Sequence, residues 1–278
     1  MADVFKKVEP AEYYRRHLTH DARPDGRQLL AFRDVVVSVG TIGTADGSAL
    51  VRLGGGGTTV VCGVKAELAS PRPDTPARGY VVPNVELPAL CAATLRPGPP
   101  TALAQTLSQA MADLIENSGC VDAGALCVSP GRLVWALHVD AVCLAHNGNL
   151  ADACAAAVVA ALRDTTLPAI TIDDETGRVR VDSGRERAPV AASAFPVAAS
   201  FAKFDNDILF ADPTAEEEAL ATATVTVATL EDGSLCLLHK AGGSAMTEKE
   251  LQQCVDRAQV RGAELRHLVN KVAASKEC

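Results

Sequence analysis

The stretch AHNGNLADACAAAVVAAL, residues 145–162, decides the fold, because a polar turn passes directly into a helix with almost no polar face. From Cys154 to Leu162 every residue is Cys, Ala, Val or Leu. A helix that is apolar on all sides is normally packed between other elements of a core. The sequence therefore predicts one central, covered helix. The stretch also raises a functional question, since the turn at a helix start is a common place for phosphate to bind.

Strands are predicted on the N-terminal side of this helix. Three runs rich in β-branched residues are separated by glycine-rich joints, and Gly54–Gly57 is the most flexible of these joints. Residues 70–100 are rich in Pro and Gly and show no helical period, and residues 70–80 are predicted to be a loop. The predicted strands are 34–40, 47–53, 58–68 and 131–145, and the predicted helices are 10–18 and 103–117, the second ending at Gly119.

Strands recur on the C-terminal side. A hairpin is predicted at 168–181 with its turn at 174–177, and a long helix closes the chain, with Thr247 and Glu250 as its capping box. This order predicts an α+β fold with two halves, in each of which antiparallel strands are covered by helices. We expect an N-terminal helix and arm at 1–30, a first half at 31–166 and a second half at 167–278. The further predicted strands are 195–204, 207–212, 220–230 and 234–240.

The composition argues against several classes of protein. The 278 residues carry a net charge of -8, so a general nucleic-acid coat is not expected, although a local patch can still bind RNA. The nine cysteines are odd in number and form no CxxC pair, which favours reduced thiols of an intracellular protein. No apolar run is long enough to cross a membrane, and residues 1–17 lack the apolar segment of a secretory signal. The histidines lack metal-ligand spacing, GGGGTT lacks the lysine of a P-loop, and no GxSxG motif is present.

Several segments, taken together, resemble one known family. RPDGR (23–27), DGSALVRLG (46–54) and TTVVCGVKAE (58–67) are similar to the RNase PH family. Three further segments resemble, within that family, the non-catalytic ring subunits of the eukaryotic RNA exosome. They are GYVVPNVELP (79–88), CVSPGRLVWALHVDAVCLAHNGNLADAC (127–154) and DPTAEEEALATATVTV (212–227). The resemblance runs from about Glu9 into the last helix, and the main departure is the longer glycine turn at 54–57.

The resemblance implies an RNase PH-like fold of the ribosomal protein S5 domain 2 type, with two βαβα halves. It also implies a six-membered ring with paralogous RNase PH-like subunits, and cap proteins with OB-like and KH modules on one face. Single-stranded RNA would pass through the channel of the ring toward separate hydrolytic exoribonucleases. The expected location is the cytoplasm and the nucleus, including the nucleolus. No cofactor, metal or membrane is expected.

The resemblance also bears on the turn before the central helix. In catalytic members a Gly-Thr-Arg-Thr-like turn holds phosphate there. The matching residues in this chain are Gly148, Asn149, Leu150 and Ala151. Leu150 stands where the arginine would be, and Asp152 adds a negative charge in the first helical turn. Gly148, Asn149, Leu150 and Asp152 are therefore predicted to be vestigial phosphate-site positions that serve as a structural turn and helix cap.

A second candidate site is acidic. Asp212 and Glu218 match the spacing of paired acids in active relatives, with Glu in place of the second Asp. Paired carboxylates can bind Mg²⁺ or move protons. The alternative is a solvated strand end at which Thr214 and Glu217 cap a short turn, and the missing phosphate arginine favours it. Of the RNA-holding arginines near the 103–117 helix Arg96 remains, either as an RNA contact in the channel or as an ordinary surface residue.

These observations predict a non-catalytic ring subunit that scaffolds 3′-to-5′ RNA processing and degradation and helps to line the RNA channel. One alternative is a phosphorolytic 3′-to-5′ exoribonuclease with a site shared across a heterodimer. Another is a stand-alone binding module outside such a ring. The most basic stretch, residues 13–27, is either a solvated helix face or a docking surface for a ring neighbour or RNA.

Overall fold

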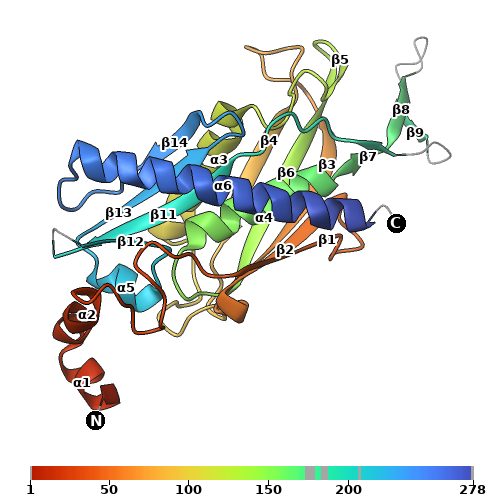
Figure 1. Cartoon of the computed structure of the whole chain (residues 1–278). Coiled ribbons are helices and arrows are strands. Elements are labelled where there is room, and N and C mark those ends of the chain that lie inside the picture. Colours follow the sequence, from red (N-terminus) through yellow and green to blue (C-terminus); the bar gives the residue numbers. More distant parts are fainter. Residues whose placement is uncertain (1, 173–178, 183–186, 206–207, 277–278) are drawn as a thin grey trace.

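The computed structural model describes residues 2–172, 179–182, 187–205 and 208–276. Two mainly antiparallel sheets form its framework, and a buried helix lies between them (Figure 1). The predicted α+β class, with antiparallel-rich sheets covered by helices, is confirmed. The boundaries of the two halves stay predictions.

The first sheet contains the strands that the sequence predicts before the central helix. Its order is β1-β2-β3-β6-β4, with β5 paired to β6, and its pairs are antiparallel except for β4 with β6. The glycine joint forms the short 3-10 turn η1 between β2 and β3. The bounds are β1 Val35–Val39, β2 Gly47–Leu53, η1 Gly54–Gly56, β3 Thr58–Ala69, β4 Tyr80–Glu86, β5 Cys127–Ser129 and β6 Leu133–Ala145.

Strand β4 is a feature that the sequence pattern did not predict. It lies in the Pro-rich and Gly-rich segment 70–100 and runs parallel to β6 at the edge of the sheet. An edge position tolerates Pro83, because a missing amide need not break a ladder hydrogen bond there. The amide of Val85 donates to Ser108 Oγ of helix α3 (Ala102–Ser118) at 2.9 Å, so α3 covers part of this edge.

Helix α4 (Leu150–Asp164) is the predicted central helix. Its residues from Ala153 to Leu162 are buried, apart from the half-buried Ala156. The helix contacts β1, β2, β3 and β6 on one side and β11 of the second sheet on the other, which explains why its sequence has no polar face. The eight described cysteines are free thiols, and seven of them are buried.

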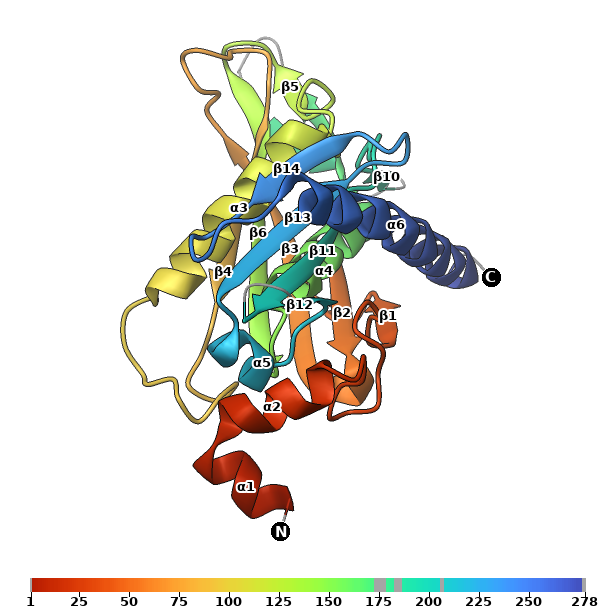
Figure 2. The same cartoon turned by 60° about the vertical axis from the view of Figure 1, so that its left-hand side comes forward.

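The second sheet has the order β12-β11-β13-β14 and is antiparallel throughout. Helix α6 (Glu248–Lys276) packs across β11, β13 and β1, and its start carries the predicted capping box of Thr247 and Glu250. Figure 2 shows α3 alongside β4 and β14, where it bridges the two sheets. The bounds are β11 Val197–Phe204, β12 Ile208–Ala211, α5 Ala215–Leu220, β13 Ala223–Thr229 and β14 Leu235–His239.

The remaining elements lie at the periphery. Helices α1 (Ala2–Val8) and α2 (Pro10–Leu18) extend from the body, and α2 meets α5 through a hydrogen bond from Tyr14 to Glu216 (Figure 2). Strands β8 and β9 form the predicted hairpin, whose turn at 174–177 lies outside the described residues. Within the described part of the chain, no helix is both long and apolar enough to span a membrane. The small strands are β7 Thr166–Leu167, β8 Ala169–Ile172, β9 Val179–Asp182 and β10 Ala188–Pro189.

Candidate functional site

The turn before α4 contains two residues in the left-handed backbone region. Gly148 has a φ of 79° and Asn149 a φ of 54°. A Cβ on Gly148 would lie 2.4 Å from the carbonyl oxygen of Pro213, in the connection between β12 and α5. Glycine is therefore required by both the conformation and the space. The start of α4 therefore lies close against the connection between β12 and α5.

Asn149 is the N-cap of α4 and a centre of polar contacts. Its Oδ1 accepts a hydrogen bond from the amide of Asp152 at 3.4 Å. Its Nδ2 donates to Asp152 Oδ2 at 2.7 Å and to Asp212 Oδ1 at 2.6 Å. One buried amide side chain thus joins the helix start to the end of β12.

Asp152 is buried and points toward the second sheet. Its carboxylate accepts hydrogen bonds from the amide of Ser200 at 2.9 Å and from Ser200 Oγ at 2.7 Å, both on β11. Burial raises the pKa of Asp152 to about 6, although the hydrogen bonds from Ser200 and Asn149 oppose that rise. Asp152 therefore ties α4 to β11 and is not free to meet a ligand.

Asp212 forms a two-pronged ion pair with Arg33, a residue just before β1. Arg33 Nη2 lies 2.8 Å from Oδ1, Arg33 Nε lies 2.9 Å from Oδ2, and the Arg33 amide donates to Oδ2 at 2.7 Å. Arg27 adds a contact of 3.1 Å to Oδ2. Burial alone would raise the pKa of Asp212, but the hydrogen bonds and charge of Arg33 outweigh it and lower that pKa to about 2.

The expectation of a solvated strand end is therefore wrong for Asp212, which is 2% exposed. The ion pair excludes water from it, and Arg33 also donates to the carbonyl oxygen of Asn147 at 2.9 Å. The predicted cap of the following turn is present, since Thr214 and Glu217 form a capping box. Glu217 is itself buried and paired with Arg23, so Arg23 of the basic stretch belongs to the interior and not to a solvated helix face.

Glu218 contacts the main chain of Asn149. Its Oε1 accepts a hydrogen bond from the Asn149 amide at 2.7 Å. Burial raises the pKa of Glu218 to about 7, although the hydrogen bond from the Asn149 amide and the charge of Arg33 oppose that rise; the carboxylates of Asp152 and Asp212 add to it. The structure thus brings both predicted acidic positions to one residue, Asp212 to the side chain of Asn149 and Glu218 to its main-chain amide. We call the following residues the Asn149 network: Arg33, Asn149, Asp152, Asp212 and Glu218.

The amides of the turn are used inside the protein. Asn147 donates its amide to Thr58 Oγ1 at 3.1 Å, and Gly148 donates to His146 Nδ1 at 3.3 Å. The Asn149 amide is bound to Glu218 at 2.7 Å. A phosphate site at a helix start depends on free amides of this kind. Here a carboxylate of the chain takes one place that an anion would use.

A cavity of about 290 Å³ opens beside the turn, between α3, the start of α4 and strands β11, β13 and β14. Leu150 is 4% exposed and lines it together with other apolar side chains. None of the described residues that line the cavity is Lys or Arg. The polar groups at its wall include His146, Glu218 and His239. We call this space the α4 cavity.

Arg96 is a predicted site residue that lies outside the Asn149 network. It is exposed in the connection between β4 and α3, and it takes no part in the hydrogen bonds of the Asn149 network. Among the described residues, no group of His, Cys, Asp or Glu has an arrangement that could hold a metal ion.

Arg33 is a residue of the site that no sequence pattern indicates. It stands alone between a turn and a strand, and its partner Asp212 lies 179 positions away. The motif RPDGR did contain useful information, because Arg23 and Arg27 both bind the β12–α5 connection through the main-chain carbonyl oxygen of Asp212. Nothing in the local pattern distinguishes these arginines from surface residues.

Comparison with family models gives two consecutive matches. Residues 31–168 match the model described as "3' exoribonuclease family, domain 1", and residues 194–261 match the model for domain 2 of the same family. The chain is also 37% identical to the exosome complex component rrp43 of Schizosaccharomyces pombe, over 91% of this chain and 92% of that protein. It is 37% identical to the exosome complex component Rrp42 of Thermococcus kodakarensis, over 91% and 92% of the two chains.

Solved structures show the same similarity in three dimensions. A chain of the Archaeoglobus fulgidus exosome with RNA bound to the active site superimposes with a TM-score of 0.83 at 32% identity, covering 96% of this chain and 98% of that one. A chain of an archaeal exosome core gives a TM-score of 0.80 at 30% identity, with 97% of each chain covered. The RNase PH-like fold that the sequence segments imply is confirmed.

Proposed function

This chain belongs to the RNase PH family of 3′ exoribonucleases, and we propose that it is a non-catalytic ring subunit of an RNA exosome. Its similarity to named exosome components extends over nearly the whole chain, and its fold matches exosome cores. In this role it assembles with paralogous RNase PH-like subunits, and single-stranded RNA passes through the shared channel. Its work is then to scaffold RNA processing and degradation.

The hydrogen bond from the Asn149 amide to Glu218 is the main support for proposing that this subunit is non-catalytic. A phosphorolytic enzyme must hold inorganic phosphate and neutralise its charge. At this turn, an internal carboxylate occupies an amide, and Leu150 brings no charge. The Arg33 guanidinium is directed to Asp212 and to main-chain carbonyl oxygens, so it already has its partners.

The exposed strand edges support assembly with neighbours. Strands β1 and β14 are outer strands of their sheets and carry large apolar side chains that solvent reaches. Val36 is 55% exposed, Leu235 49% and Leu238 53%. Apolar edge strands tend to pair with other chains, and ring neighbours would cover them.

The wider assembly is part of the same proposal. Cap proteins with OB-like and KH modules bind one face of the ring, and hydrolytic exoribonucleases receive the RNA that leaves it. The complex works in the cytoplasm and the nucleus, including the nucleolus. Arg96, exposed in its loop, is a candidate contact with the RNA backbone in the channel.

One observation favours the alternative of a phosphorolytic site shared across a heterodimer. Asp212 and Glu218, the two acids that match active relatives, both bind Asn149. An arginine from a neighbour would still have to reach phosphate beside Glu218. We therefore rank this function second.

Two experiments test the proposal. A tagged copy of the chain, isolated from cells of its source and analysed by mass spectrometry, should recover RNase PH-like paralogues and cap proteins; recovery of the chain alone would contradict the ring. The ring assembled with those paralogues should degrade RNA at the same rate when Glu218→Gln is introduced. Phosphate-dependent decay that this substitution abolishes, in a ring that still assembles, would instead establish the shared catalytic site.

A further inference from the structure

We propose that the α4 cavity is a binding site for a small apolar organic cation, held with its ammonium or amidinium group against the Glu218 carboxylate. This inference does not rest on the proposed function, because a ring subunit needs no ligand in this cavity. The family resemblance predicts an anion beside the turn before α4. The ligand proposed for the cavity beside that turn is instead a cation.

The walls of the cavity select an apolar body. Leu107 and Met111 of α3, Leu150 of α4 and Leu237 of β14 line the space of about 290 Å³. This volume is near the lower limit for pockets that hold small organic ligands. A single ring with a short side arm would remove these apolar surfaces from water.

The acidic group at the cavity is the Glu218 carboxylate, which can accept a further hydrogen bond. Glu218 uses Oε1 to accept the Asn149 amide, while Oε2 accepts no hydrogen bond from any described residue. A largely buried carboxylate in apolar surroundings is stabilised by a cation that donates to it. None of the described residues lining the cavity is Lys or Arg, so the protein leaves that place open.

The charges behind the cavity wall point in the same direction. The carboxylates of Asp152 and Asp212 raise the pKa of Glu218, whereas the charge of Arg33 lowers it. The guanidinium groups of Arg33 and Arg27 are bound to Asp212. At pH 8 the three carboxylates of Glu218, Asp152 and Asp212 outnumber these two guanidinium groups, so an entering anion would meet net negative charge, whereas a cation would reduce it.

Benzylamine, benzyl alcohol, benzoate and inorganic phosphate form a suitable set of probes. The first three share one ring and differ in the charge of the arm. Isothermal titration calorimetry on the full-length chain at pH 8 should show benzylamine binding roughly tenfold or more tightly than benzyl alcohol, because a charged hydrogen bond to a desolvated group contributes about that much. Benzoate and phosphate should bind more weakly than the alcohol.

Three variants locate the binding. Glu218→Gln should reduce the affinity for benzylamine to that of benzyl alcohol and leave the alcohol unchanged. Glu216→Gln, on the same helix but paired with Lys6 and Tyr14 away from the cavity, should keep the preference for the amine. Ala110→Phe should fill the space and weaken both ligands.

The affinity for the amine should also fall as the pH drops from 8 to 6, since Glu218 takes up a proton over that range. Burial and the charge of Arg33 lower the pKa of His146, which also lines the cavity, so this imidazole gains its charge only at lower pH. Equal affinity for amine and alcohol, tighter binding of benzoate or phosphate, retention of amine selectivity in Glu218→Gln, or no binding of benzylamine at millimolar concentration would each overturn the inference.

Discussion

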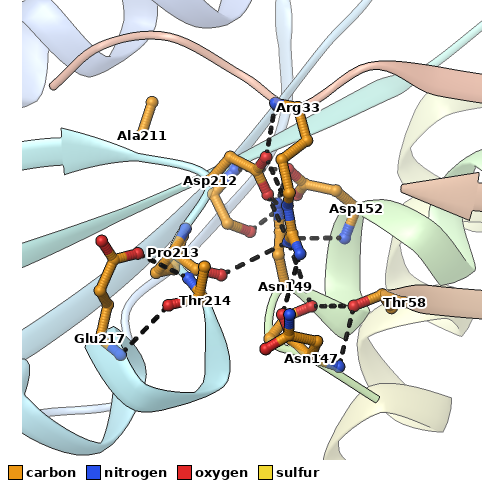
Figure 3. A network of polar contacts seen from close by, with 12 residues as sticks. Arg33, Thr58, Asn147, Asn149, Asp152, Ala211, Asp212, Pro213, Thr214 and Glu217 are labelled. Carbon is orange, nitrogen blue, oxygen red and sulfur yellow. Dashed lines mark hydrogen bonds and ion pairs between the residues drawn. The ribbon is translucent and has the colours of Figure 1, made fainter. Parts of the chain in front are cut away.

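Arg33 and Asp212 form a buried, two-pronged ion pair, with Nη2 2.8 Å from Oδ1 and Nε 2.9 Å from Oδ2. Arg33 precedes the first strand of the first sheet, and Asp212 follows β12 at the edge of the second. The pair therefore couples the two sheets at the point where α4 begins (Figure 3).

Removing the negative charge of this pair should be strongly destabilising. In Asp212→Asn the guanidinium of Arg33 stays buried without a counter-charge, so we expect a loss of about 3–5 kcal/mol in the free energy of unfolding. Urea denaturation followed by circular dichroism measures it.

The matched control is Asp25→Asn, which removes the more exposed partner of Arg27. That change should cost less than about 1 kcal/mol, as exposed ion pairs do. Equal unfolding midpoints for wild type and Asp212→Asn would show that the pair contributes nothing.

The titration of Glu218 should make the free energy of unfolding depend on pH. Its pKa is raised from 4.5 to about 7, so the folded chain keeps a proton that the unfolded chain has lost. The resulting stabilisation is complete below pH 4.5 and is lost as the pH rises to about 7. Asp152, raised from 3.8 to about 6, contributes with the same sign. We therefore expect the free energy of unfolding to fall between pH 5 and pH 8.

Glu218→Gln tests the origin of that decline. It keeps an oxygen for the Asn149 amide but cannot ionise, so it should remove about 1–3 kcal/mol of the decline, as measured by urea denaturation at pH 5 and pH 8. Asp212 acts in a different pH range. Its stabilising effect is present above pH 3.8 and is lost as the pH falls toward about 2. A decline of unchanged size in Glu218→Gln would assign the effect to other groups.

Gly148 should tolerate no side chain. Ala at this position combines a positive φ with a contact of 2.4 Å to the Pro213 carbonyl oxygen, and the expected loss of stability is about 2–5 kcal/mol. Gly131→Ala is the control, because its φ of 72° is similar but nothing lies within 4 Å of the added Cβ. That change should cost about 1–2 kcal/mol. Thermal denaturation of both variants gives the comparison, and equal losses would mean that the contact with Pro213 is not rigid.

Leu150→Arg should not create a phosphorolytic enzyme. The new guanidinium would enter the α4 cavity beside Glu218 and pair with that carboxylate, which leaves no net positive charge for phosphate. The expected result is no difference in RNA decay with and without inorganic phosphate, while a catalytic relative in the same assay shows a clear difference. Phosphate-dependent decay by this single variant would contradict the role given to Glu218.

Much of the fold follows from patterns that are local in the chain. The apolar circumference of α4 predicts its burial, and the glycine-rich joint at 54–57 predicts the turn between β2 and β3. The capping box at Thr214 and Glu217 is likewise a property of a few neighbouring residues. Strand β4 escaped prediction because Pro83 argues against a strand unless its edge position is already known.

The amino-acid sequence by itself determined most of the helices and strands, though not β4, and where the central helix begins, since these depend on residues within one or two turns of each other. Tertiary structure alone decided what the polar residues do. Asp212 looks like a solvated acid until folding brings Arg33 to it from 179 positions away, and only folding brings Glu218 to the amide of Asn149, 69 positions before it. The physical reason is that the state of a charged group depends on its burial and on the charges beside it, and both arise only when distant segments pack together.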